Sequence, residues 1–154
     1  MFPLPYHQNS FYASRAAFVI HYLTNGTKTF QWIERILLEK LPDLTDSSFY
    51  NKSDVDLLNL FEEYVSDMGV DVATFRDMVD RRNSNQFERY TRIMWKYACS
   101  RGVAGTPTYI VNGIVHPNIE QSWGLNEWKL FINPLLQPQL FDDIDYLEIN
   151  QPEE

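Results

Sequence analysis

The feature that most constrains the fold lies at residues 101–115, where a long amphipathic segment ends and two short β-rich runs follow. Gly102 ends the amphipathic segment, because glycine readily takes the left-handed conformation that closes a helix. Asn112-Gly113 separates the β-rich runs, and this dipeptide indicates a hairpin because a type I′ turn needs positive φ at both central residues. Thr106-Pro107 comes before the first run, where a proline removes no hydrogen bond from the middle of a ladder. The sequence therefore predicts a helix, a loop and a β-hairpin in that order.

Hydrophobic periodicity predicts a series of helices before this stretch. Residues 11–23 are apolar on almost every side, which indicates a buried helix that Asn25-Gly26 stops. Another helix is predicted over residues 29–41, and a further one begins with a capping box formed by Ser53 and Asp56.

Two more helices are predicted before Gly102 and one after the hairpin. Asp71 caps a short helix, Asn83 or Ser84 caps a longer one, and residues 120–132 form the last. We expect the apolar stripes of these helices to form the core. The stripes are Phe30, Ile33, Leu37 and Leu41; Leu57, Leu58, Phe61, Tyr64, Val65 and Met68; Phe87, Tyr90, Met94, Tyr97 and Ala98; and Trp123, Trp128, Phe131 and Ile132.

Length and charge bound the possible partners. With 154 residues, 44% of them apolar, a single compact domain over residues 1–137 is expected, followed by an acidic tail over residues 138–154. The net charge of −8 argues against non-specific binding to nucleic acid or to an anionic membrane. The tail holds six of the acidic residues: Asp142, Asp143, Asp145, Glu148, Glu153 and Glu154. We interpret it as a solvated terminus, with an acidic docking tail as the alternative.

The sequence lacks the patterns of several familiar chemistries. Cys99 is the only cysteine, so no disulfide forms within the chain and no C-x-x-C motif exists. Cys99 lies near the C-terminal end of a predicted helix, where the dipole disfavours a thiolate; we expect it to pack in the core, with a reactive single thiol as the alternative. The histidines, His7, His21 and His116, have no metal-ligand spacing, and no nucleophile elbow, phosphate loop or dinucleotide motif is present. We therefore expect neither a metal nor a cofactor.

Targeting signals are also missing from these residues. No apolar run is long enough to span a membrane, and the first residues lack the basic start and apolar centre of a signal peptide. The default expectation is a cytoplasmic protein.

Two stretches carry a resemblance to a known family. The loop and hairpin "GVAGTPTYIVNG" at 102–113, and "FPLPYH" at 2–7 followed by a capped, alanine-rich helix, resemble the DsbA type of the thioredoxin superfamily. The resemblance implies an α/β fold with a helical insertion followed by a C-terminal hairpin and helix. It also implies a cis bond at Thr106-Pro107 in a loop formed by Gly105, Thr106 and Pro107. In that family the residue before the proline offers its backbone to an extended peptide or protein substrate.

The resemblance leaves out the redox part of the family. The N-terminal βαβ half, which carries the C-x-x-C motif, has no counterpart here, so we expect an incomplete thioredoxin-like fold. Disulfide exchange needs an activated thiolate and a second, resolving thiol, so we expect the chain to be redox-inactive and at most to bind peptide.

Other interpretations remain open. One alternative is that Thr106-Pro107 only shapes the entry to a strand. A second is that the chain is a fragment or truncated isoform of an active oxidoreductase whose C-x-x-C half lies upstream. A third is a helical protein-interaction module. An unpaired sheet edge would also favour self-association.

Overall fold

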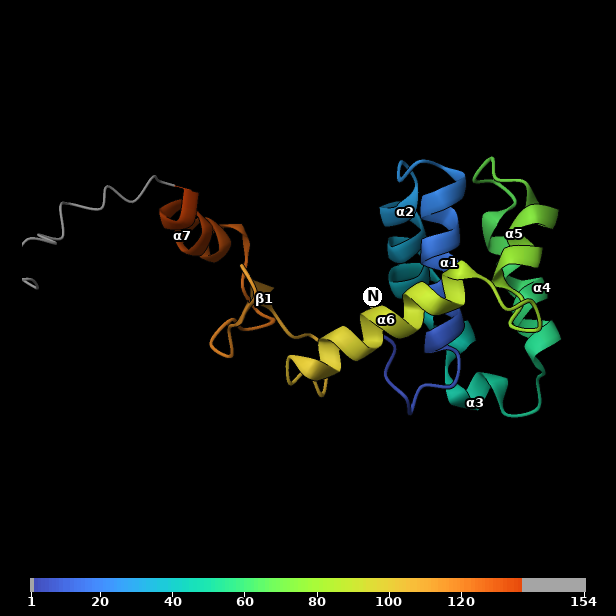
Figure 1. Ribbon diagram of the computed structural model, residues 1–154, viewed down its shortest axis with the longest axis horizontal. Helices are drawn as coiled ribbons and strands as arrows, with labels where there is room; N and C mark the ends of the chain where they lie inside the picture. Colours follow the sequence, from blue (N-terminus) through green and yellow to red (C-terminus); the bar gives the residue numbers. More distant parts are fainter. Residues whose placement is uncertain (1, 137–154) are drawn as a thin grey trace, which may run out of the picture. The chain divides into compact units, whose positions relative to one another are not determined.

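The computed structural model describes residues 2–136, and the chain divides into two compact units at Thr108 (Figure 1). We call residues 2–108 the helical unit and residues 109–136 the hairpin unit. Within the described residues the protein is mostly helical, with one two-stranded antiparallel sheet.

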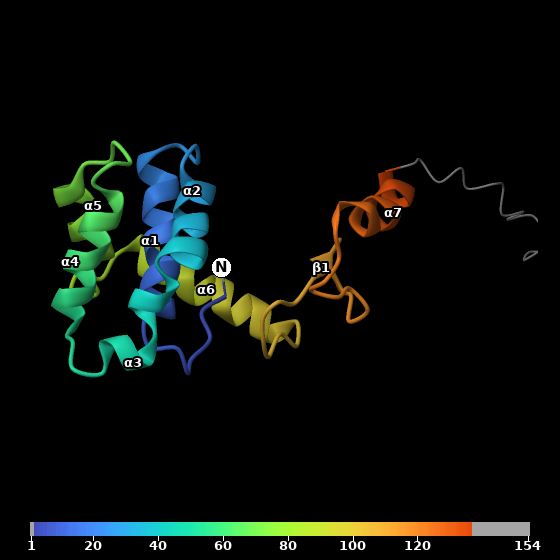
Figure 2. The ribbon, with the colours of Figure 1, turned by 180° about the vertical axis from the view of Figure 1, so that it is seen from behind.

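The helical unit is built around helix α1 (Ser10–Leu23). Both α2 (Thr29–Glu34) and α5 (Val72–Val79) pack against α1, which lies between them in the front and back views (Figure 1, Figure 2). The remaining elements are a π-helical turn η1 (Arg35–Glu39), a short 3-10 turn η2 (Leu41–Leu44), and helices α3 (Asp46–Phe49), α4 (Asp54–Val65) and α6 (Gln86–Ser100).

The core confirms the prediction for α1. Ala13, Ala16 and Ala17 are buried, and their small side chains allow neighbouring helices to approach closely. Trp32 of α2 is fully buried, donates from Nε1 to the carbonyl of Ala13 at 3.2 Å, and meets the ring of Phe61 edge-on at 5.2 Å between centroids. The stripe predicted over residues 57–68, in α4 and the turn after it, is buried as predicted: Leu57, Leu58, Phe61, Tyr64, Val65 and Met68.

Helix ends follow the local sequence closely. Ser53 and Asp56 form the predicted capping box of α4, and the Asp71 side chain caps α5. The cap of α6 is Asn85, one or two residues later than predicted. Asn83 is engaged elsewhere, because its amide donates to Asp77.

Two of the predicted core stripes are largely exposed. On α2 and η1 the core contact is made by Trp32 and Ile36, which lie on a neighbouring face, so the side chain of Phe30 is 82% exposed. On α6 the buried residues are Phe87 and Thr91. The other stripe residues with large exposed surfaces are Leu37, Leu41, Tyr90, Met94 and Tyr97. Both helices have more than one apolar face, and packing against α1 selects one of them.

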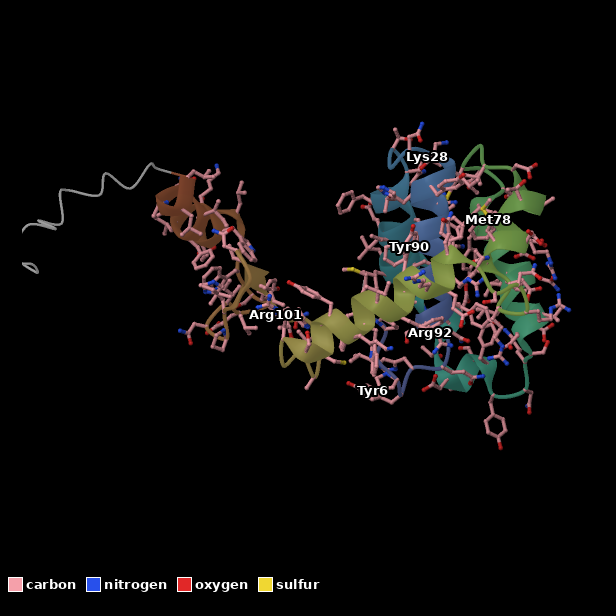
Figure 3. The ribbon with its side chains drawn as sticks, viewed as in Figure 1. Tyr6, Lys28, Met78, Tyr90, Arg92 and Arg101 are labelled. Carbon is pink, nitrogen blue, oxygen red and sulfur yellow. The ribbon has the colours of Figure 1, made fainter. Side chains whose placement is uncertain are left out.

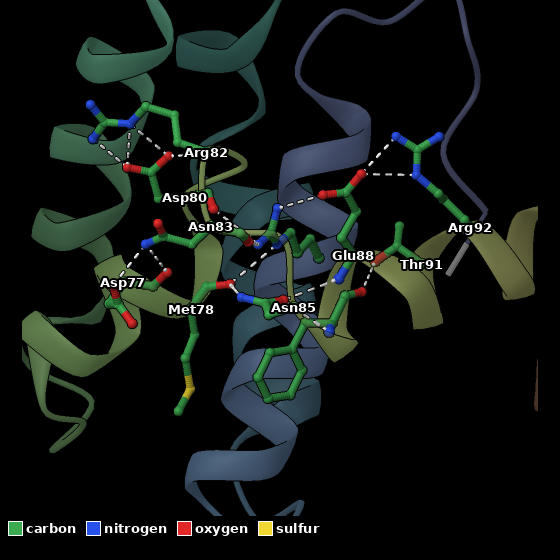
Figure 4. Close-up of polar contacts among 11 residues, drawn as sticks. Asp77, Met78, Asp80, Arg82, Asn83, Asn85, Glu88, Thr91 and Arg92 are labelled. Atoms are coloured by element: carbon green, nitrogen blue, oxygen red, sulfur yellow. Dashed lines mark hydrogen bonds and ion pairs between the residues drawn. The ribbon is translucent and has the colours of Figure 1, made fainter.

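A buried arginine ties α1 to the chain between α5 and α6, where Figure 4 labels its acceptors Met78, Asp80 and Asn83. The side chain of Arg15 is fully buried and donates to the carbonyls of Met78, Asp80 and Asn83 at 3.2, 3.0 and 2.9 Å. Its guanidinium also lies 3.5 Å from a carboxylate oxygen of Glu88. The turn that leads into α6 is thus held by one cation.

The hairpin unit consists of β1 (Ile110–Val111), β2 (Ile114–Val115) and α7 (Leu125–Leu136). Asn112 and Gly113 have φ of 51° and 81°, which confirms the predicted turn. In place of the predicted 120–132, α7 begins at Leu125 and continues through Pro134. The predicted acidic tail at residues 138–154 lies outside the described residues.

Candidate functional site

The loop that the sequence singled out follows directly from the end of α6. Gly102 has a φ of 77°, its N–H donates to the carbonyl of Cys99 at 3.0 Å, and the N–H of Val103 donates to Ala98 at 3.1 Å. This pair of bonds is the Schellman arrangement, which satisfies carbonyls that a helix end otherwise leaves unpaired. Val103 is buried, so the first residue after the glycine fixes the start of the loop.

The loop itself is largely exposed to solvent. The Thr106-Pro107 bond is cis, as predicted, and both residues are exposed, whereas Gly105 is half-buried. The hydroxyl of Thr108 donates to the carbonyl of Gly105 at 2.6 Å and closes the loop. Thr106 makes no hydrogen bond to any other residue in the range 2–136.

The chain continues from the loop into β1, whose outer edge is unpaired by any strand in residues 2–136. Ile110 faces Val115 across the hairpin, and Val111 faces Ile114. The N–H of His116 donates to the carbonyl of Tyr109 at 2.9 Å, so Tyr109 belongs to a hydrogen-bonded pair. Pairs alternate along an antiparallel ladder, and the N–H and C=O of Ile110 therefore point outward.

The two faces of the hairpin differ within the hairpin unit. The ring of Tyr109 meets Trp128 of α7 at 5.2 Å between centroids, and His116 meets Phe131 at 4.9 Å. Side chains alternate between the faces of a strand, so Ile110 and Val115 point to the side opposite these rings. Val115 is 37% exposed. The hairpin thus offers an unpaired edge next to an apolar pair.

Cys99 does not pack in the core. It is a free, exposed cysteine in the last turn of α6, which corrects the expectation of a small buried residue. The polar flank of α6 faces solvent at this position, because the buried face of the helix runs through Phe87 and Thr91. A possible reactive thiol at Cys99 remains a prediction.

The histidines are not gathered into one site. Nδ1 of His21 lies 3.0 Å from the hydroxyl of Thr29, and the ring of His7 meets Tyr6 edge-on. The ring of His116 packs against Phe131 in the hairpin unit. Among residues 2–136, no group of three or more His, Cys, Asp or Glu side chains is arranged to hold a metal ion.

A cluster of basic side chains on α6 was not predicted from the sequence. Arg89, Arg92 and Lys96 follow one flank of α6, and their spacing of three and four residues was a signal available in the sequence. In the structure this flank borders two surface hollows that meet at Arg92.

Comparison with known proteins gives no relative: no family, no curated protein and no solved structure matches this chain. Within residues 2–136, none of the helices has the length and apolar character needed to cross a bilayer.

Proposed function

We propose that the chain is a DsbA-like member of the thioredoxin superfamily that binds an extended peptide along residues 106–111 and carries out no disulfide exchange by itself. The observation that supports this most directly is the outward-pointing backbone of Ile110 on an unpaired edge. Thr106, four residues before Ile110 in the chain, has backbone groups without a partner among the described residues.

Strand addition fits the chemistry of this edge. A peptide that pairs with β1 would accept a hydrogen bond from the N–H of Ile110 and donate one to its carbonyl. Two-stranded sheets are marginal in water, and a third strand would add both hydrogen bonds and cross-strand contacts. Ile110 and Val115 would offer apolar surface to alternate side chains of the peptide.

The single cysteine limits the chemistry. A catalyst of dithiol exchange cycles between a thiolate pair and a disulfide, and this polypeptide has one thiol, at Cys99. The proposed activity is therefore recognition of peptide rather than its oxidation or reduction.

The test uses Ile110→Pro, which removes the outward N–H and leaves the bonds between β1 and β2 in place. The matched control is Ile110→Thr, which keeps the N–H and is well suited to a strand. The probe is an unfolded, carboxymethylated polypeptide, and binding is measured by fluorescence anisotropy. We expect Ile110→Pro to lose binding and Ile110→Thr to retain it. Equal binding by both variants, or none by the unmodified chain, would contradict the proposal.

A second candidate function is a helical interaction module. It is favoured by the exposed apolar stripe on α2 and η1, where Phe30 and Leu38 are 82% and 75% exposed. Exposed patches of this kind usually mark contacts with other proteins. Replacing Phe30 and Leu38 by serine should abolish self-association in sedimentation experiments, whereas Tyr50→Ser, at a side chain 85% exposed on the end of α3, should not. A monomeric unmodified chain at high concentration would count against this function.

A further inference from the structure

The two flanks of α6 have opposite character. Tyr90 and Arg92 lie on opposite sides of the helix (Figure 3). The flank of Tyr90 is apolar, and the flank of Arg92 carries Arg89 and Lys96 as well. Residues three and four apart are neighbours on a helix surface, so these three cations form one continuous basic stripe.

The stripe is unusual because two of its three charges, those of Arg89 and Lys96, are not paired with a carboxylate in the described part of the chain. Of the 13 Lys and Arg residues in the chain, nearly all contact a carboxylate, a carbonyl or an aromatic ring. Within residues 2–136, those that contact none of these are Arg89, Lys96 and Lys129. Two of the three thus lie on the same flank of one helix, in a chain whose net charge is −8.

Arg92, at the centre of the stripe, is held in place with part of its guanidinium unused. Its Nε and Nη2 donate to Glu88 at 2.9 and 2.7 Å (Figure 4). The guanidinium lies 5.6 Å from the centroid of the Phe11 ring. Nη1 makes no hydrogen bond to a residue in the described range. An oriented donor of this kind suits a carboxylate.

Two surface hollows meet at Arg92. One, of about 360 Å³, is lined by the basic stripe together with Ile93 and Glu88. The other, of about 240 Å³, is lined mainly by apolar and aromatic side chains, among them Pro3, Leu4, Phe11 and Trp95. A basic hollow and a more apolar one therefore share Arg92 in their lining and lie next to each other within the helical unit.

We infer that these two hollows form a docking groove for an acidic peptide segment that carries an apolar side chain beside its acids. The acids would contact Arg89, Arg92 Nη1 and Lys96, and the apolar side chain would enter the hollow beside Phe11 and Trp95. The positive charge of the stripe favours a negatively charged partner. The apolar hollow next to it favours an apolar side chain beside the acids of that partner. A nucleic acid fits less well, because Glu88 lines the basic hollow and the chain as a whole is acidic.

Cys99 provides the probe for a test. It is the only cysteine, it is exposed, and it lies seven residues after Arg92 on the same flank of α6. A fluorophore attached there should report binding of the synthetic peptide Glu-Asp-Phe-Glu-Asp-Leu. All variants are made in the full chain with Asp142, Asp143 and Asp145 changed to asparagine and Glu148, Glu153 and Glu154 changed to glutamine, so that the acids of the tail do not compete.

We expect saturable binding that weakens as salt is raised, and about a tenfold loss in the double variant Arg89→Glu, Lys96→Glu. Neither side chain has a partner to lose, so the variant should fold, which circular dichroism checks. Lys129→Glu is the matched control, since it makes the same change at an unpaired lysine of α7, and it should bind normally. Replacing the peptide's Phe by Ala should also weaken binding.

Several results would overturn the inference. These are an absence of binding at low salt, an equal loss in Lys129→Glu, or tighter binding of a thymidine oligonucleotide than of the acidic peptide. The proposed function at residues 106–111 would be untouched by any of them, because it concerns another part of the chain.

Discussion

Replacing Arg15 by methionine should strongly destabilise the helical unit. The side chain of Arg15 is fully buried in α1, and its guanidinium donates to three carbonyls contributed by Met78, Asp80 and Asn83. Methionine is of similar length but has no donor, so the change removes the polar contacts while filling most of the same space.

The loss of stability in Arg15→Met depends on which acceptors keep another hydrogen-bond donor. The carbonyl of Met78 still accepts from Asn85 Nδ2, that of Asp80 still accepts from the N–H of Asn83, and Glu88 still pairs with Arg92. The carbonyl of Asn83 loses its donor. Breaking a buried charged network costs about 3–5 kcal/mol, and a buried acceptor without a donor costs about 1–3 kcal/mol. Because most acceptors keep a partner, we expect the free energy of unfolding to fall by about 3 kcal/mol, the low end of this range.

The measurement is urea denaturation followed by circular dichroism at about 222 nm, with the free energy of unfolding extrapolated to water. The control is Arg81→Met, because Arg81 pairs with Asp54 at 2.9 Å on the surface and its side chain is 65% exposed. Surface pairs contribute about 0–1 kcal/mol. If the free energies of unfolding of Arg15→Met and Arg81→Met differ by less than about 1 kcal/mol, Arg15 is not the cation that holds this turn.

Two further predictions concern titrating groups, and a third concerns the reactivity of Cys99. Burial and the nearby Asp54 raise the pKa of Tyr12 to about 12. The raised pKa stabilises the fold fully below the unfolded pKa of about 10, and this contribution should be lost as the pH rises above that value. Tyr12→Phe should remove this part of the alkaline unfolding curve. Arg82 holds the pKa of Asp80 below its usual value. Asp80 therefore stabilises the fold above the unfolded pKa of about 3.9, and that contribution is lost at lower pH. Between about pH 5 and pH 2, the free energy of unfolding should change less in Asp80→Asn than in the unmodified chain. Cys99 should react with an aromatic disulfide reagent in the native protein because it is exposed, yet insulin reduction should match a Cys99→Ser control; turnover that disappears in the Ser variant would contradict the single-thiol argument.

Local signals in the sequence predicted the local structure well, whereas they did not predict which helix faces pack in the core. The Asn112-Gly113 turn, the Gly102 helix end and the Ser53 cap each depend on a few adjacent residues, and each forms as predicted. The buried faces of α2 and α6 depend on which apolar side meets α1, and the sequence offers more than one. Arg15 could not be identified as a core residue, because its partners are carbonyls 63 to 68 residues away.

The candidate sites divide in the same way. The loop of Gly105, Thr106 and Pro107 lies in a contiguous stretch and was found from its sequence. The groove beside α6 combines a helix flank with residues 3–11, before and at the start of α1, more than 80 positions before Arg92. The spacing of the cations was visible, but the prolines and Phe11 that complete the groove were not.

The π-helical turn η1 has a consequence for comparing sequences. The N–H of Lys40 donates to the carbonyl of Arg35 at 3.0 Å, five residues back, so the turn holds one residue more than an α-helix of the same length would. Removing one residue between Arg35 and Glu39 would let the helix close with regular bonds while Trp32 stays in the core. A homologue could therefore differ by a single-residue gap here and keep the same packing. Alignments that forbid a gap inside this helix would shift every later position of η1 out of register.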